Sequence, residues 1–494
     1  MFKVGFDNDK YLKLQSGKIK ERISLFGERL YIEFGGKLFD DFHAARVLPG
    51  FAPDSKIRML AELKDEAEII IAINASDIEK NKVRGDIGIT YDLDVLRLID
   101  AFRGWGLYVG SVVMTRYKSS PAADTFKQKL QNLGIKVYKH YDIDGYPHNV
   151  PLIVSDEGFG RNEYAETTRS IVIVTGPGPG SGKMATCLSQ IYHESKMGRK
   201  SGYAKFETFP IWNVPLNHPV NLAYEAATAD LNDMNMIDPF HLDAYGVPVV
   251  NYNRDVEVFP VLSSMLEGIL GECPYKSPTD MGVNMAGYCI FDDEAVRYAA
   301  KHEIIRRYYN ALCSIRKGGG SEIERGKIEL LMQKLSCSCR DRLSVKPALD
   351  KAESTGAPAV SIELNDGRIV TGKTSSVLGA SSAALLNALK TLAGIDKSID
   401  VISPEILEPI QRLKVDHLGN HNPRLHTDEV LIALSISAVN DPNSKRAMEA
   451  IPALRYAEVH STVILSQVDA STFRKLGVNL TCEPMYQTKK LFHS

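Results

Sequence analysis

Short apolar runs that look like strands alternate with helical patterns through the first half of the chain, and this alternation limits the fold more than any other feature. The expected strands cover residues 29–34, 68–74, 107–115, 135–141, 170–175, 202–209 and 247–252. Helical patterns separate several of them, for example residues 91–106 and 124–134. Such alternation predicts an α/β fold whose mostly parallel sheet is covered by helices on both faces. In sheets of this kind, ligands bind beyond the carboxyl ends of the strands.

Length, charge and cysteine content narrow the class of protein. A chain of 494 residues is too long for one core, and a net charge of -2 argues against a dedicated nucleic-acid or membrane surface. The N-terminus lacks the pattern of a signal peptide, and the longest apolar runs are only strand-sized. Seven cysteines, an odd number, do not suggest a disulfide framework. We therefore expect a cytoplasmic protein that binds neither nucleic acid nor membrane.

The pattern changes after residue 291, which suggests three parts. Residues 1–290 form the expected α/β domain, and two long helical patterns joined by a glycine-rich turn make residues 291–343 a helical hairpin segment. Residues 344–494 read as a second α/β domain. It begins with two strands joined by Asn365, Asp366 and Gly367, which is a strong hairpin signal.

One glycine-rich turn follows the expected strand at residues 170–175 and precedes a helical pattern. The phosphate-binding loop of nucleotide enzymes reads G-x-x-x-x-G-K-[ST], and this turn departs from it at Pro177 and Met184. Consecutive backbone N–H groups, a lysine and a helix N-terminus still favour binding of a phosphate group. The expected phosphate- or nucleotide-binding residues in the turn are Gly176, Gly178, Gly180, Ser181, Gly182 and Lys183.

Met184 replaces the hydroxyl that would hold Mg²⁺ in that loop. Thr186 lies two residues further along, roughly on the opposite face of the helix, so it does not simply take over this role. Either another group holds the metal, or the ligand is not a Mg²⁺–triphosphate. The alternative interpretation is a tight turn that lets strand and helix pack closely.

Charged residues after neighbouring strands could complete such a site. Lys205 and Arg254 are expected to contact phosphate, and Asp255 or Asp238 could orient a metal or act as a base. Together with Lys183, these two carboxylates are the candidate catalytic residues. For each segment alone, a capped helix or a polar loop is the competing explanation.

A histidine-rich segment lies in the last part of the chain. His417, His421 and His426 lie near several carboxylates and could bind Zn²⁺ or another divalent ion. However, glycine and proline interrupt the segment, so the two-histidine helix geometry of zinc enzymes is not expected. Thr427 instead begins a helical pattern, where the neighbouring acidic groups would cap the helix.

Several long motifs resemble a known bacterial family. These are "TGPGPGSGKMATCLSQIYHE", "VNYNRDVEVFP", "SPTDMGVNMAG" and "HLGNHNPRLHTDE". They resemble domain-of-unknown-function family 1846, and the resemblance covers essentially the whole chain. It implies a cytoplasmic bacterial protein with an N-terminal domain carrying a nucleotide-loop-like turn, a helical segment and a C-terminal α/β domain. It implies no particular activity.

Two weaker resemblances concern parts of the chain. The loop and the strand carrying Lys205 look like ATP-dependent synthetases of the dethiobiotin-synthetase type, although Met184 departs from their Ser/Thr. The C-terminal hairpin and the helix after it look like the start of a cytidine-deaminase-like fold. The zinc motifs of that fold, H-x-E and P-C-x-x-C, are absent from the sequence, which argues against zinc deamination.

The preferred functional hypothesis is an enzyme that binds a phosphate-bearing small molecule at residues 176–183. The ligand would be ATP or GTP with a divalent metal, used in phosphoryl or nucleotidyl chemistry. A nucleotide-sensing or scaffold protein without catalysis, with a homo-oligomer as one option, is the first alternative. A metal-dependent hydrolase that uses the histidines of residues 416–429 is the second.

Overall fold

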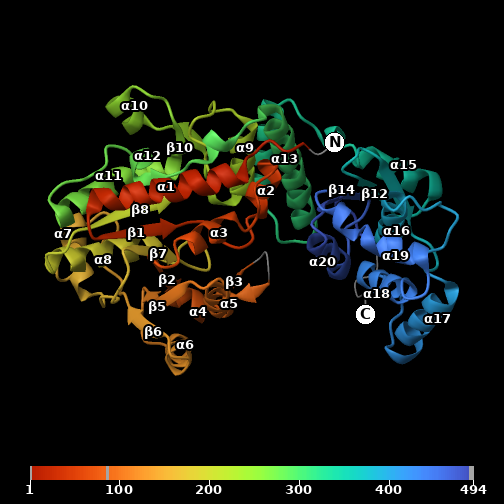
Figure 1. The fold of residues 1–494 in the computed structure, drawn as a ribbon, viewed down its shortest axis with the longest axis horizontal. Helices are drawn as coiled ribbons and strands as arrows, with labels where there is room; N and C mark the ends of the chain where they lie inside the picture. Colours follow the sequence, from red (N-terminus) through yellow and green to blue (C-terminus); the bar gives the residue numbers. More distant parts are fainter. Residues whose placement is uncertain (1–2, 85–87, 489–494) are drawn as a thin grey trace. The chain divides into compact units, whose positions relative to one another are not determined.

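The structure, a computed structural model, describes residues 3–84 and 88–488. The chain divides into two compact units, whose elements are labelled in Figure 1. The larger unit comprises Gly5–Glu225 and Asn232–Arg297, and the smaller comprises Met1–Val4, Ala226–Leu231 and Tyr298–Ser494.

A parallel sheet of seven strands organises the larger unit in the described part of the chain. The strands are β1 (Arg29–Phe34), β2 (Ala67–Asn74), β5 (Tyr108–Thr115), β6 (Lys136–Lys139), β7 (Ile171–Thr175), β8 (Ser201–Phe206) and β11 (Gly282–Val283). Their order is β11-β8-β1-β7-β2-β5-β6, and every neighbouring pair is parallel. All residues of β2 and β7 are buried, as expected for strands covered on both faces. The predicted α/β fold with a parallel sheet is confirmed.

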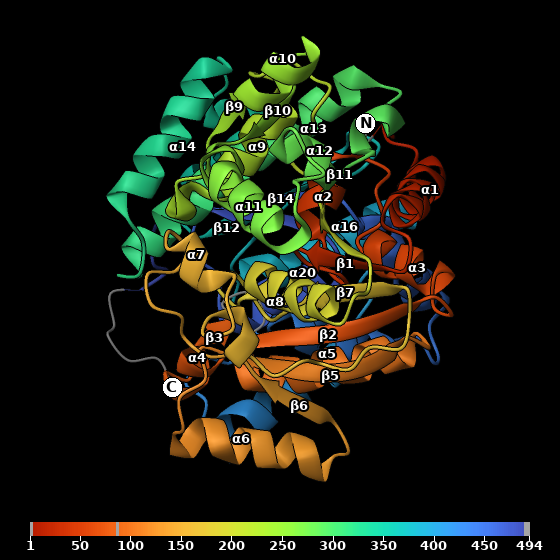
Figure 2. The same cartoon turned by 90° about the vertical axis from the view of Figure 1, so that its left-hand side faces the viewer.

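Helices cover both faces of this sheet (Figure 2). Leucines, isoleucines and aromatic residues of four helices pack in the hydrophobic core on one face: α1 (Asn8–Phe26), α3 (Ser55–Glu62), α5 (Tyr91–Gly104) and α6 (Pro121–Asn132). The core on the other face is formed with α7 (Val150–Ile153), α8 (Lys183–Lys196) and α11 (Asn253–Leu270). Alternate residues of each strand face the two cores, so neither face of the sheet is left open.

One predicted strand of the parallel sheet lies elsewhere. Part of residues 247–252 forms β10 (Val250–Tyr252), which pairs antiparallel with β9 (Asn235–Ile237) in a separate small sheet. The two strands are close in sequence, because only α10 (Pro239–Tyr245) and short turns separate them. Local antiparallel pairing therefore replaces the crossover that a place in the parallel sheet would require.

The remaining elements of the N-terminal part are short. They are α2 (Phe42–Val47), α4 (Ala75–Glu79), β3 (Val83–Arg84), β4 (Ile89–Thr90), α9 (Pro219–Ala227) and α12 (Pro278–Met281).

The smaller unit contains a mixed sheet of four strands in the order β13-β12-β14-β15. The strands are β12 (Ala359–Glu363), β13 (Ile369–Lys373), β14 (Glu458–Ser461) and β15 (Asn479–Cys482). The predicted hairpin is confirmed, since β12 and β13 pair antiparallel and Gly367 has a φ of 87°. The chain also forms α13 (Asp293–Arg316), α14 (Glu322–Lys334), α15 (Val345–Thr355), α16 (Ala380–Leu392), α17 (Pro404–Arg412), α18 (Thr427–Ser437), α19 (Pro442–Glu449) and α20 (Gln467–Lys475).

Two properties bear on the expected environment of the chain. Within the described residues, each helix is either too short or too polar to span a lipid bilayer. All seven cysteines have free thiols.

Candidate functional site

Two neighbouring strands of the parallel sheet send the chain to opposite faces. After β1 the chain continues through α3, which packs in one core, whereas after β7 it continues into α8, which packs in the other. β1 and β7 are adjacent and in parallel register. Connections that diverge in this way leave a crevice beyond the carboxyl ends of the two strands, which is where ligands bind in open α/β sheets. The glycine-rich turn lies at this point.

The turn at residues 176–182 has a backbone that requires glycine. Gly182, the residue before α8, has a φ of 88°, and Gly180 has a φ of 76°. A Cβ on Gly182 would lie 2.8 Å from the side chain of Thr115, and a Cβ on Gly178 would collide with the hydroxyl of Tyr91. The left-handed backbone and the close neighbours together explain why these positions carry no side chain.

The carbonyl groups of the turn are held by the rest of the protein. The Ser181 hydroxyl donates to the Gly178 carbonyl at 2.7 Å, and the Thr115 hydroxyl donates to the Ser181 carbonyl at 2.8 Å. The Asn74 amide, at the end of β2, donates to the Gly180 carbonyl at 3.4 Å. Because the C=O and N–H of one trans peptide point in opposite directions, the N–H groups that follow Gly180 and Ser181 point away from these contacts.

The N–H groups of the turn are free of such contacts. Throughout the described chain, no protein acceptor is found for the backbone N–H of Gly178 or of the six residues 180–185. The first intrahelical hydrogen bond of α8 comes from Thr186, which donates to the Gly182 carbonyl at 2.9 Å. A run of unbonded N–H groups at a helix start attracts an anion, because the helix dipole adds positive potential there.

Lys183 is the first residue of α8 and lies beside the turn. Its Nζ is 3.3 Å from the Gly178 carbonyl and 3.5 Å from the Ser181 hydroxyl, and no carboxylate pairs with it in the part of the chain that the structure describes. Burial lowers the pKa of Lys183, and the charge of Lys205 lowers it further, against the opposing effect of Glu33. An ammonium that is partly desolvated and lacks a counter-ion is suited to binding an anionic ligand.

Glu33 is a residue of this site that sequence reasoning missed. It lies near the carboxyl end of β1, opposite Val174 of β7, and its Oε2 accepts a hydrogen bond from the Tyr203 hydroxyl at 2.7 Å. Its charge acts on both Lys183 and Lys205. The available signal was a single carboxylate near the end of a largely apolar strand that two glycines follow directly.

Lys205, Glu207 and Asp255 form a cluster at the carboxyl end of β8. The Lys205 ammonium lies 2.8 Å from Glu207 Oε1 and also pairs closely with Asp255, at the start of α11. Burial raises the pKa of Glu207 to about 8, the Asp255 charge adds to this rise, and Lys205 opposes it. Burial also opposes ionisation of Asp255, yet Lys205 holds the pKa of that carboxyl below its usual value. The two sequence candidates Lys205 and Asp255 are therefore brought together.

Asp238 and Arg254, the other two candidate site residues from the first part of the chain, form hydrogen bonds or ion pairs with residues outside the turn. Asp238 caps α10, accepting hydrogen bonds from the backbone of Phe240 and His241, and it also accepts from the Thr279 hydroxyl at 2.6 Å. Arg254 pairs with Asp233. Neither pairing brings these residues to the glycine-rich turn.

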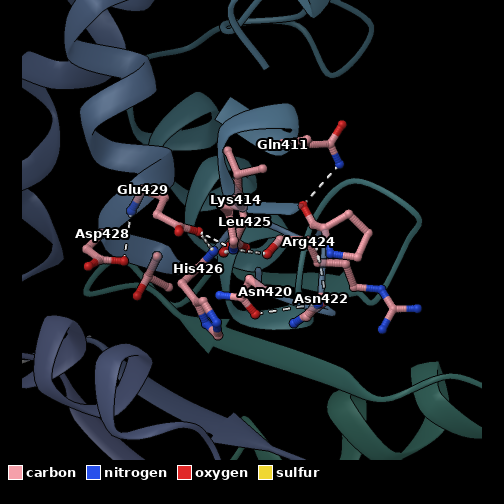
Figure 3. A network of polar contacts seen from close by, with 12 residues as sticks. Gln411, Lys414, Asn420, Asn422, Arg424, Leu425, His426, Asp428 and Glu429 are labelled. Atoms are coloured by element: carbon pink, nitrogen blue, oxygen red, sulfur yellow. Dashed lines mark hydrogen bonds and ion pairs between the residues drawn. The ribbon is translucent and has the colours of Figure 1, made fainter. Parts of the chain in front are cut away.

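The histidine-rich segment forms a local polar network, drawn in Figure 3. His426 precedes α18 in a capping box, in which its backbone N–H donates to Glu429 Oε2 at 2.7 Å. The same carboxylate lies 2.8 Å from the buried ammonium of Lys414. The predicted helix start at Thr427 is confirmed.

The three histidines of this segment differ in their surroundings. His426 Nδ1 lies 3.2 Å from Asp469 Oδ2, and this hydrogen bond raises the pKa of His426. His417 and His421 are exposed. Among the residues that the structure describes, no three His, Cys, Asp or Glu side chains are grouped closely enough to hold a metal ion.

Comparison with known proteins covers nearly the whole chain. Residues 4–336 match the N-terminal part of the domain of unknown function DUF1846, and residues 340–492 match its C-terminal part. A UPF0371 protein of Streptococcus thermophilus is 57% identical over 492 residues, which is 100% of both chains. A UPF0371 protein of Corynebacterium glutamicum is 60% identical over 490 residues, or 99% of both chains. A family model over both halves and full-length relatives at such identity show that the chain belongs to the DUF1846 family.

Proposed function

We propose that the crevice beyond β1 and β7 binds the phosphate group of a small molecule, and that this molecule is a nucleotide. The observation that carries the proposal is the run of backbone N–H groups at Gly178 and residues 180–185, for which the described chain offers no acceptor. Buried or half-buried N–H groups rarely stay without a partner, because leaving one unpaired costs about 1–3 kcal/mol. A phosphate would accept several of them at once.

Charge at the turn supports an anion rather than a neutral ligand. Lys183 brings a positive charge to the N-terminus of α8, and the helix dipole adds to it. The other nearby lysine, Lys205, already has an ionised partner in Asp255 and also contacts Glu207. Lys183 and the N–H groups are therefore the groups that would stabilise negative charge on a phosphate, as phosphoryl or nucleotidyl transfer requires.

Met184 stands where the usual phosphate-binding loop has a Ser or Thr, and this replacement changes which groups could coordinate a metal ion. Met184 offers no oxygen to Mg²⁺, so a metal arriving with ATP or GTP would rely on phosphate oxygens, water and a carboxylate. Glu33 is the carboxylate whose charge acts on Lys183. We propose it, in preference to Asp238, as the acidic group that faces the bound ligand.

Thermal unfolding of the full chain with defined ligands tests the proposal. ATP, GTP, ADP, pyrophosphate and inorganic phosphate are each added with Mg²⁺ and with EDTA. A ligand at a hundred times its Kd should stabilise the folded state by about 2.7 kcal/mol. Lys183→Ala should abolish the effect. Lys196→Ala, at the other end of the same helix, should retain it, because that lysine pairs with Asp156 at an exposed position.

Two outcomes would count against the proposal. If none of the five ligands stabilises the protein, the turn is a tight connection between strand and helix. If Lys183→Ala responds as the unchanged protein does, the ligand binds elsewhere. Binding without release of phosphate or pyrophosphate would favour the nucleotide-sensing protein without catalysis over an enzyme.

For the C-terminal unit we propose a cytidine-deaminase-like arrangement without zinc chemistry. The antiparallel pair β12 and β13, followed directly by α16, supports this likeness. Neither H-x-E nor P-C-x-x-C occurs in the sequence. A zinc determination on purified protein tests the proposal that the C-terminal unit lacks zinc chemistry. One equivalent of zinc that resists dialysis would contradict it.

A further inference from the structure

Two buried polar atoms near the carboxyl end of β8, Glu207 Oε2 and Trp212 Nε1, have no hydrogen-bond partner in the described chain. Glu207 is only 6% exposed, so water does not readily satisfy its free oxygen. Because an unpaired buried polar group is costly, atoms of this kind in a native protein call for a ligand or another explanation.

The side chains of Glu207 and Trp212 lie close together. A Cβ on Gly282 would be 2.7 Å from the Trp212 ring and 3.3 Å from Glu207 Oε2, so the indole and the carboxyl approach each other over this glycine. The Trp212 carbonyl accepts a hydrogen bond from Val250 at 3.1 Å, which fixes Trp212 beside β10. This region is partly accessible to solvent, since the side chains of Lys205 and Asp255 are 21% and 17% exposed.

The region around Glu207 and Trp212 is also close to the glycine-rich turn at residues 176–182. β8 and β7 flank β1, and neighbouring strands are about 4.8 Å apart, so the ends of β7 and β8 are about 10 Å apart. The charges of Lys183 and Lys205 interact across this distance, with Glu33 acting on both. A phosphate in the turn and a second molecule at β8 could therefore meet above β1.

We infer that the carboxyl end of β8 is an acceptor subsite, in which the Trp212 indole N–H holds the hydroxyl group of a second substrate and Glu207 takes its proton. The inference rests on the proposed nucleotide binding by the turn. The substrate class is a small molecule with a free hydroxyl, and water is its smallest member.

The hydroxyl oxygen attacks the terminal phosphorus of the nucleotide, and a new P–O bond forms. The bond between that phosphorus and the bridging oxygen breaks, and its electron pair leaves with the diphosphate. The proton of the hydroxyl passes to Glu207 Oε2. Lys183 and the N–H groups stabilise the charge on the transferred group. Glu207 is the catalytic residue of this step, and Lys205 and Asp255 position it.

The ionisation of Glu207 determines the pH range of the reaction. The charged and titratable groups that act on it are Lys205 on its own strand, Asp255 on α11 and Tyr252 on β10. Burial and Asp255 raise the pKa of Glu207 to about 8. Only the ionised carboxylate accepts a proton, so the rate should rise about tenfold per pH unit below this pKa and level off above it.

Phosphate release from ATP with water as the acceptor tests the inference. The full chain and its variants are assayed with Mg²⁺ between about pH 6 and pH 9.5, and ATP binding is measured separately by calorimetry. Glu207→Gln should bind ATP with a Kd within about twofold of the unchanged protein and lose the rate about 100-fold or more above pH 8. Glu267→Gln, at an exposed position of α11, is the control and should change neither the Kd for ATP nor the rate of phosphate release.

The outcomes separate the two proposals. ATP binding with a normal rate in Glu207→Gln, or binding with no phosphate release at any pH, would overturn the acceptor subsite and leave nucleotide binding intact. A rate of the unchanged protein that is flat between about pH 6 and 8 would also overturn it, even if the variant does not fold. Failure of the unchanged protein to bind any phosphate ligand would overturn the nucleotide proposal and the subsite with it.

Discussion

The glycine-rich turn at residues 176–182 and the histidine-rich segment at residues 416–429 both contain the residue types of a functional site, yet their hydrogen bonding is opposite. In the turn, carbonyl groups are bound by the protein, and the described chain offers no acceptor to seven N–H groups. In the histidine-rich segment, Lys414, His426 and Glu429 satisfy one another (Figure 3). Unused hydrogen-bonding capacity therefore separates a candidate ligand site from a structural network better than residue type does.

Removing the buried ammonium of the histidine-rich segment should have the largest effect on stability. Lys414→Ala removes the ammonium that pairs with the Glu429 carboxylate and donates to the Arg424 carbonyl, so we expect a loss of about 3 kcal/mol in the free energy of unfolding. Both tryptophans, Trp105 and Trp212, lie in the larger unit. The loss should therefore appear in urea unfolding followed by far-UV circular dichroism and be weaker in tryptophan fluorescence.

Lys445→Ala, at an exposed position in the same unit, is the matched control and should change the free energy by less than about 0.5 kcal/mol. Equal stability of Lys414→Ala and Lys445→Ala would mean that the network in Figure 3 contributes little to folding.

Adding a side chain to a glycine of the turn at residues 176–182 should have the next largest effect on stability. Gly182→Ala must adopt a φ of 88° and places its Cβ 2.8 Å from Thr115, whereas Gly180→Ala has a φ of 76° and no atom within 4 Å. The left-handed backbone costs each variant about 1–2 kcal/mol, and the close contact adds about 1–3 kcal/mol to Gly182→Ala alone. Tryptophan-monitored unfolding measures this difference. Identical stabilities would indicate that the turn can move away from Thr115.

The ion pair of His426 and Asp469 should contribute less, and in a pH-dependent way. The hydrogen bond to Asp469 raises the pKa of His426 in the folded protein, so its contribution is complete below the unfolded pKa of about 6.5 and is lost as pH rises through the folded value. His426→Asn should therefore lower stability by less than about 1 kcal/mol, mainly below pH 6.5. The exposed His421→Asn is the control, and a constant difference between pH 5 and pH 9 would argue against this pair.

The smallest change in stability is expected for the residue most important for binding. Burial lowers the pKa of Lys183, which means that folding disfavours its charged form. Without ligand, Lys183→Ala should therefore unfold with the same or a slightly higher free energy, although it loses ligand binding. Thermal unfolding in phosphate-free buffer measures this. A clear loss of stability would show that Lys183 supports the fold and would weaken its assignment to a ligand.

The order of apolar runs in the sequence was sufficient to predict the parallel sheet, the turn after β7 and the hairpin of β12 and β13. Residues 247–252 were placed in the wrong sheet, because their apolar character does not reveal that β9 is the nearer partner. Glu33 was not found, because its closeness to Lys183 and Lys205 comes from the packing of strands that are far apart in the sequence. Trp212 was not found, because a missing hydrogen-bond partner is a property of three-dimensional packing. For the same reason, the sequence did not distinguish Asp238, which caps a helix, from Asp255, which lies beside Lys205.

The insertion of β7 between β1 and β2 has a consequence for biosynthesis. β2, β5 and β6 leave the ribosome before β7, so the early sheet lacks its central strand and exposes two unpaired edges. The nascent chain therefore passes through a stage that is prone to self-association. Fragments ending before Ile171 should accumulate in inclusion bodies, whereas fragments that extend through β8 could close the gap.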